Sequence, residues 1–228
     1  MAFSLHGVRV PHRKNTADKP AVRMESPKTV TLPMSMHIGA PCQPIVAVGD
    51  HVCMGQMIAQ AQAPVSAPIH ATVSGTVKAI CPMEHSSGVM MNSIVIENDF
   101  QDELDPSIAP IDHSEMSPEA MIECIRKAGI VGHGGAAFPT HIKLSSAIGK
   151  VDTVIINAGE CEPYITSDDR LCREEPAKVI GGLKIVMKVF GLSEGHIGIE
   201  DNKPEAVKAL NACLCKEDGI SVDVLPAK

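Results

Sequence analysis

The sequence predicts two modules of different class: a β-rich module followed by an α/β domain built on a parallel sheet. From Thr29 to about residue 100, short runs of β-forming residues are interrupted by Gly and Pro, as in β-structure with tight turns. From about residue 117, β-branched runs alternate with segments of helical periodicity, and this alternation implies a parallel sheet. No apolar run reaches the length of a membrane span.

Two similar stretches define the β-rich module. The runs "PIVAVGDHVCMGQMIAQ" (44–60) and "APIHATVSGTVKAI" (67–80) each place β-formers around a Gly-Asp or Ser-Gly turn. The first resembles the biotinyl/lipoyl-type barrel-sandwich hybrid, with its run V-x-x-G-D-x-V-x-x-G-Q-x-I from Val46 to Ile58. A carrier domain of that type needs a lysine on the hairpin between its halves, and 59–71 contains none. A structural module is therefore predicted rather than a carrier.

The predicted boundaries follow from changes in composition. They are an irregular arm (1–28), the barrel-sandwich module (29–100), an acidic, Pro-containing linker (101–116) and the α/β domain (117–228).

Within the α/β domain, Ser117 and Pro118 form a helix start and Gly129 an end. Strands are expected at 152–157, 195–201 and 220–225, and helices at 176–190 and 204–214. Helices that alternate with parallel strands predict a sheet covered on both faces.

Charge and cysteine spacing exclude several functions. The formal net charge of −7 and the lack of a basic stripe argue against nucleic-acid binding. The eight cysteines contain no C-x-x-C pair, the spacing that zinc and iron–sulfur sites generally use. The sequence therefore predicts no metal site among these residues.

The stretch "GHGGAAFPT" (132–140) is the first candidate for ligand binding. Its glycines leave backbone N–H groups open to an anionic or flat ligand. Thr140 is expected to cap the next helix, Lys143 to add positive charge, and Phe138 to form an apolar wall. A plain turn is the alternative, and neither the Walker nor the G-x-G-x-x-G pattern is matched.

The second candidate, "NAGECEPYITSDDR" (157–170), directly follows a predicted strand. Glu160 and Glu162 alternate around Cys161. They form either a solvated acidic turn or, with Asn157, a set of hydrogen-bonding groups for a ligand's ring, amide or ribose. Both candidate motifs are expected at the same end of one sheet, which favours the second interpretation.

Together, "GxGGAAFPTHxK" and "NxxECEPY" closely resemble the C subunit of the Rnf ion-translocating NADH–ferredoxin oxidoreductase complex, and more distantly the flavoprotein subunit of respiratory complex I. Relative to the latter, Ala137, Gly159 and Tyr164 are departures that affect details of flavin contact. The resemblance assigns two groups of site residues. Those expected near FMN are Gly132, Gly134, Lys143, Asn157 and Glu160, and those near the nicotinamide nucleotide are Gly135, Phe138 and Glu162.

The resemblance implies an electron-transfer protein of a larger assembly, cytoplasmic and peripheral on the inner face of the cell membrane. Such a protein accepts hydride from NADH onto FMN and passes electrons to iron–sulfur clusters, expected only beyond Lys228. Its partners are NADH and the other subunits of a membrane-bound complex. Because the sequence stops at "VLPAK", a truncated α/β domain with weak FMN affinity is expected. The alternatives are a soluble relative (the proline-reductase-associated electron-transfer protein or a cobalamin reductase) and a non-catalytic docking or carrier module.

Overall fold

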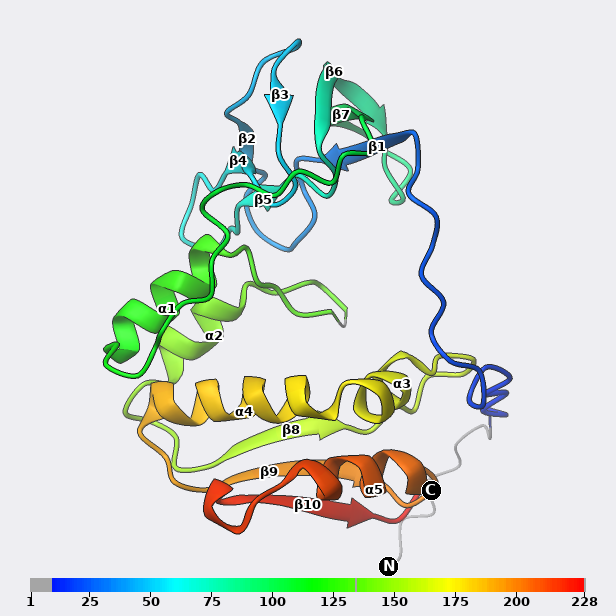
Figure 1. Cartoon of the computed structure of the whole chain (residues 1–228), viewed down its shortest axis with the longest axis vertical. Helices are drawn as coiled ribbons and strands as arrows, with labels where there is room; N and C mark the ends of the chain where they lie inside the picture. The colour runs from blue at the N-terminus through cyan, green and yellow to red at the C-terminus, as the bar shows by residue number, and fades with distance from the viewer. Residues whose placement is uncertain (1–9, 134, 228) are drawn as a thin grey trace, which may run out of the picture. The chain divides into compact units, whose positions relative to one another are not determined.

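The computed structural model describes residues 10–133 and 135–227 and divides into two compact units (Figure 1). One unit is Met24–Ile148, which contains the β-module and the first two helices. The other joins the N-terminal arm, up to Arg23, to the chain from Gly149 onward. The boundaries predicted at residues 28, 100 and 116 remain predictions.

The β-module consists of two antiparallel sheets around a common aliphatic core. The first sheet has the order β1 (Thr29–Pro33), β7 (Met90–Asn98), β6 (Gly75–Glu84), β3 (His51–Val52). The second has the order β2 (Gln43–Pro44), β4 (Met57–Gln60), β5 (Ile69–His70). Alternate residues of the long strands point into the core, where Ile94, Ile96 and Val77 are fully buried.

The predicted Gly-Asp turn forms before β3. Gly49 has a φ of +96°, which glycine adopts without strain. The Asp50 carboxylate accepts a hydrogen bond of 2.8 Å from the amide of Ala47. The turn predicted from the Gly-Asp pair therefore forms, and it lies between β2 of the second sheet and β3 of the first.

Two helices follow the β-module in the same unit. Helix α1 (Pro118–Lys127) starts as predicted, because the Ser117 hydroxyl accepts a 3.2 Å hydrogen bond from the amide of Ala120. Helix α2 (Thr140–Ala147) does not use Thr140 as its cap. Thr140 is the first residue of the helix, so the N-cap position falls on Pro139, which has no side chain that can cap. The Thr140 amide donates a hydrogen bond to Ile130 O.

The other unit is a three-stranded parallel sheet with its connecting helices. The strands are β8 (Val154–Ala158), β9 (Gly195–Glu200) and β10 (Ile220–Leu225), in the order β10-β9-β8. The helices are α3 (Ser167–Glu174), α4 (Pro176–Phe190) and α5 (Pro204–Cys213), and a short 3₁₀ turn spans Lys216–Asp218. The predicted strands and the helices α4 and α5 are confirmed to within two residues, whereas α3 was not predicted.

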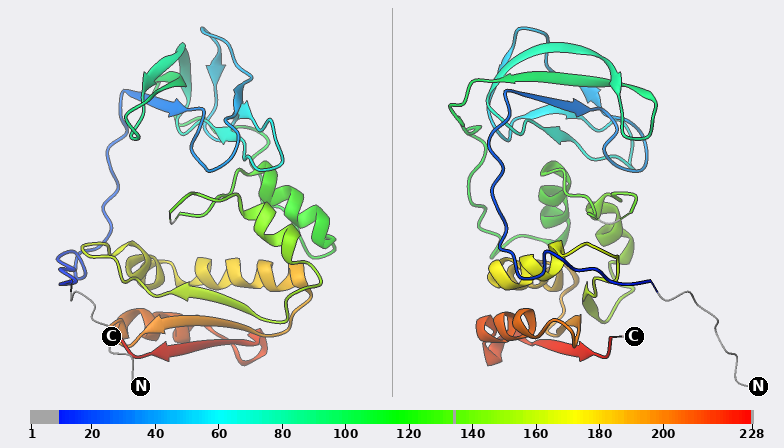
Figure 2. Two further views of the ribbon diagram at one scale, coloured as in Figure 1. Left: turned by 180° about the vertical axis from the view of Figure 1, so that it is seen from behind. Right: turned by 90° about the vertical axis from the view of Figure 1, so that its right-hand side faces the viewer.

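The expectation that this sheet is covered on both faces is wrong for the described part of the unit. Figures 1 and 2 show α4 and α5 packed beside the sheet, and one core cluster joins both helices to all three strands. The strands are added in sequence order from β8 to β10, so two right-handed crossovers place both helices on the same face. On the other face Ile155 is 65% exposed. Among the residues that the structure describes, no helix is long and apolar enough to cross a membrane.

Candidate functional site

The glycine motif forms a closed loop between α1 and α2. Val131 and Pro139 pair as an isolated β-bridge, and the Gly132 amide donates a 2.9 Å hydrogen bond to Phe138 O. The loop is also tied to the β-module, because the Ile38 amide donates to Ala136 O at 2.9 Å. Backbone hydrogen bonds therefore hold the loop at its neck, where Gly132 meets Phe138, and at Ala136.

The loop carries open backbone and an available positive charge. Gly135 has a φ of +61°, and a Cβ atom there would meet nothing within 4 Å. A Cβ atom at Gly132 would lie 3.3 Å from Nζ of Lys143, so the ammonium group lies over the loop's neck. Across the described ranges, no hydrogen-bond or ion-pair partner is found for this ammonium group. Phe138 is half-buried, and Gly134 lies outside the described residues.

The acidic motif forms the turn between β8 and α3. The Asn157 side chain accepts a 3.0 Å hydrogen bond from the Gly159 amide, which turns the chain directly after the strand. The side chains of Asn157 and Glu162 are exposed at this carboxyl end of β8. Carboxyl ends of parallel strands are the usual ligand-binding edge of such sheets.

Glu160 occupies a very different position from Glu162. It is only 5% exposed, and Oε1 accepts a 2.8 Å hydrogen bond from the Asp168 amide, which caps the start of α3. Oε2 lies 3.6 Å from Nζ of Lys203 and 3.9 Å from Nζ of Lys14. The carboxylate is therefore used inside the unit, where it holds the helix start and two lysines together.

Lys14 fastens the acidic turn to the N-terminal arm, and sequence reasoning missed it. Its ammonium group donates to the carbonyls of Glu160 at 2.7 Å, Glu162 at 2.9 Å and Ile165 at 2.5 Å. The Tyr164 amide completes the attachment with a 2.9 Å bond to His12 O. The available signal was the basic stretch "HRK" at 12–14 in a chain that also carries an acidic turn.

The predicted site residues thus fall into two sets. The glycine loop brings together Gly132, Gly135, Phe138 and Lys143 in one compact unit, and the acidic turn brings together Asn157, Glu160 and Glu162 in the other. The expected position of both motifs at one end of the same sheet remains a prediction.

Comparison with known proteins finds a separate family match for the β-module and for the later part of the chain. The family described as the RnfC barrel sandwich hybrid domain matches residues 3–101, and the family described as the Nuo51 FMN-binding domain matches residues 125–228. The chain is 45% identical over 225 residues to the C subunit of the Na(+)-translocating ferredoxin:NAD(+) oxidoreductase complex of Acetobacterium woodii. The chain thus resembles RnfC-type subunits over nearly its whole length.

Two further relatives show how much of their length this chain covers. The C subunit of the ion-translocating oxidoreductase complex of Klebsiella pneumoniae is 40% identical over 97% of this chain and 30% of its own length. Its counterpart in the proton-translocating ferredoxin:NAD(+) oxidoreductase complex of Clostridium ljungdahlii is 43% identical over 95% of this chain and 48% of its own. The A. woodii protein is covered over 51% of its length, with 97% of this chain aligned. The chain therefore spans about half of two relatives and less than a third of the other.

Proposed function

We propose that this chain is the FMN- and NADH-binding part of an RnfC-type electron-transfer protein. The observation that carries the proposal is an open glycine loop with a lysine over its neck, within the segment that matches the Nuo51 FMN-binding domain family. The exposed Asn157 and Glu162, at the carboxyl end of β8, supply the second set of binding groups.

The residues of the glycine loop fit the chemistry of a flavin phosphate. At Gly135 a Cβ atom would meet nothing within 4 Å, so a flat ring or an anionic group can approach the main chain closely there. At Gly132 the corresponding space is taken by the Lys143 ammonium group. The Lys143 ammonium group has no partner to give up among the described residues, so it is available to hold negative charge on the ligand. Phe138 provides an apolar surface beside the loop.

The acidic turn fits the hydroxyl and amide groups of a nicotinamide nucleotide. The Glu162 carboxylate is exposed and accepts hydrogen bonds, while Asn157 offers both a donor and an acceptor. Glu160 acts indirectly in this arrangement, since its carboxylate holds the start of α3 and thereby the turn. Bound FMN would supply the chemistry, accepting hydride and releasing electrons one at a time. In the proposed role, the electrons would be passed on to iron–sulfur clusters of a complex on the inner face of the membrane.

Changing Lys143 to alanine is expected to weaken FMN binding about tenfold, because one charge-assisted hydrogen bond is worth about 1.5 kcal/mol. The measurement is a titration of FMN with the chain, followed by quenching of flavin fluorescence. The matched control is Lys127→Ala, an exposed lysine at the end of α1 in the same unit. Equal affinity of the wild type and Lys143→Ala, or no saturable binding at all, would contradict the proposal.

A further inference from the structure

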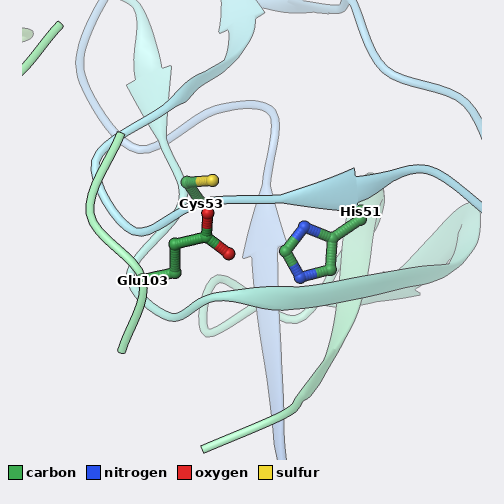
Figure 3. Close-up of side chains that lie close together, drawn as sticks. All are labelled: His51, Cys53 and Glu103. Atoms are coloured by element: carbon green, nitrogen blue, oxygen red, sulfur yellow. The ribbon is translucent and has the colours of Figure 1, made fainter. Parts of the chain in front are cut away.

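A cluster of metal-ligand side chains lies in the β-module, away from the glycine loop. His51 lies on β3, Cys53 directly follows that strand, and Glu103 comes from the segment after β7. Their ligand atoms (an imidazole nitrogen, Sγ and a carboxylate oxygen) all lie within 4.8 Å of one another. Figure 3 shows the ends of the three side chains converging on one region.

The backbone that carries Glu103 is hydrogen-bonded to the chain directly after β3. The Met54 amide donates a 2.7 Å hydrogen bond to Glu103 O, and the Asp105 amide donates a 3.0 Å bond back to Met54 O. The Glu103 amide donates to the Ser74 hydroxyl at 3.1 Å. This segment around Glu103 and Asp105, part of the predicted linker, is termed the strap. Its bonds to Met54 and Ser74 mean that the cluster is built on hydrogen-bonded backbone.

His51 has the orienting partner that metal-binding histidines generally have. Its Nε2 lies 2.9 Å from a carboxylate oxygen of Asp99, and Asp99 accepts further bonds from the Ser74 hydroxyl at 2.6 Å and the Gln101 amide at 2.9 Å. A carboxylate in this position can accept the Nε2 proton of His51, and that arrangement leaves the lone pair of Nδ1 for a cation.

Cys53 contributes the sulfur ligand of the cluster. A bound cation would take the place of the thiol proton, which leaves to solvent, and convert the sulfur into a thiolate ligand.

We propose that His51, Cys53 and Glu103 bind a thiophilic divalent cation of the Zn²⁺ class, with water at the fourth position. One nitrogen, one sulfur and one oxygen ligand suit Zn²⁺ or Co²⁺, whereas Mg²⁺ and Ca²⁺ require mostly oxygen. Ligand atoms around tetrahedral zinc lie about 3.3–3.8 Å apart, so atoms that lie within 4.8 Å of one another need only a small movement to bind one ion. The Glu103 side chain is exposed and can make this adjustment while His51 keeps its bond to Asp99.

This site departs from the prediction of no zinc, which rested on cysteine spacing. A site with a single cysteine has no C-x-x-C signature, and its third ligand comes from fifty residues further along the chain. The cation would clip the strap after β7 onto β3, and so stabilise the β-module.

The test is a titration of the reduced 228-residue chain with Co²⁺, followed by competition with Zn²⁺. We expect one Co²⁺ per chain, a thiolate-to-cobalt charge-transfer band, and loss of that band in Cys53→Ser. His51→Gln and Glu103→Gln are each expected to weaken binding at least tenfold, and Asp99→Asn about tenfold through its effect on His51.

The control is Cys215→Ser, which removes an exposed cysteine that is close in sequence to Cys213, in the other unit. It is expected to leave the band and the affinity unchanged. A band that survives Cys53→Ser, a band lost in Cys215→Ser, or no band in the wild type would overturn the proposal. Circular dichroism of each variant separates ligand loss from unfolding, and the Asp99→Asn and Glu103→Gln affinities decide the matter should Cys53→Ser fail to fold.

Discussion

Replacing Glu160 with alanine is expected to lower the free energy of unfolding of the α/β unit by about 3 kcal/mol. The substitution leaves the Lys203 ammonium group buried without its carboxylate partner. It also removes the side-chain acceptor of the Asp168 amide at the start of α3. Loss of a helix cap and a buried charge left unpaired are two of the few mechanisms that produce effects of this size.

The chain provides a matched control two residues away. Glu162 is exposed, and its side chain takes part in neither of these interactions, so Glu162→Ala is expected to change stability by less than about 0.5 kcal/mol. The sequence contains one tyrosine and no tryptophan, so the fluorescence of Tyr164 in a urea titration reports on this unit alone. If Glu160→Ala and Glu162→Ala unfolded at similar urea concentrations, the buried Glu160 carboxylate would contribute nothing to the stability of the unit.

The elements that sequence reasoning predicted are those with local signals. Helix α4 begins at Pro176 and ends before Gly191, whose φ of +67° suits a glycine, and both residues are visible in the sequence. The Ser117 cap and the Gly-Asp turn are equally local. In each case the residues that determine the structure lie within a few positions of one another, so a single sequence is sufficient.

The features that were missed depend on residues far apart in the chain. Helix α3 starts where the Glu160 carboxylate accepts the Asp168 amide, and the residue at its N-cap position, Thr166, makes no side-chain bond to the helix. The bonds that tie the strap after β7 to Met54 and Ser74 join residues far apart in the chain, and the local sequence gives no sign of them. The coverage of the sheet depends on strand order, which hydrophobic periodicity does not contain.

Lys14 is the clearest case of a residue whose importance only the structure reveals, and Lys14→Met is expected to destabilise the acidic turn. The change removes three hydrogen bonds to the carbonyls of Glu160, Glu162 and Ile165, together with one of the two cations beside the Glu160 carboxylate. The Lys14 side chain is 15% exposed, so water replaces these bonds poorly. A loss of about 2 kcal/mol in the stability of the turn is expected.

Hydrogen exchange measures this loss where it occurs. The Tyr164 amide is bonded to His12 O in the arm, so freeing the arm should speed its exchange by more than about tenfold, while amides in β9 keep their wild-type rates. The control is Lys19→Met, an exposed lysine further along the same arm, which should leave the Tyr164 amide unchanged. Unchanged exchange in Lys14→Met would mean that the turn holds its shape without the arm. Exchange accelerated only around the turn would make Lys14 a positioning residue for Glu162, because its bond to Glu162 O fixes the backbone from which that carboxylate projects.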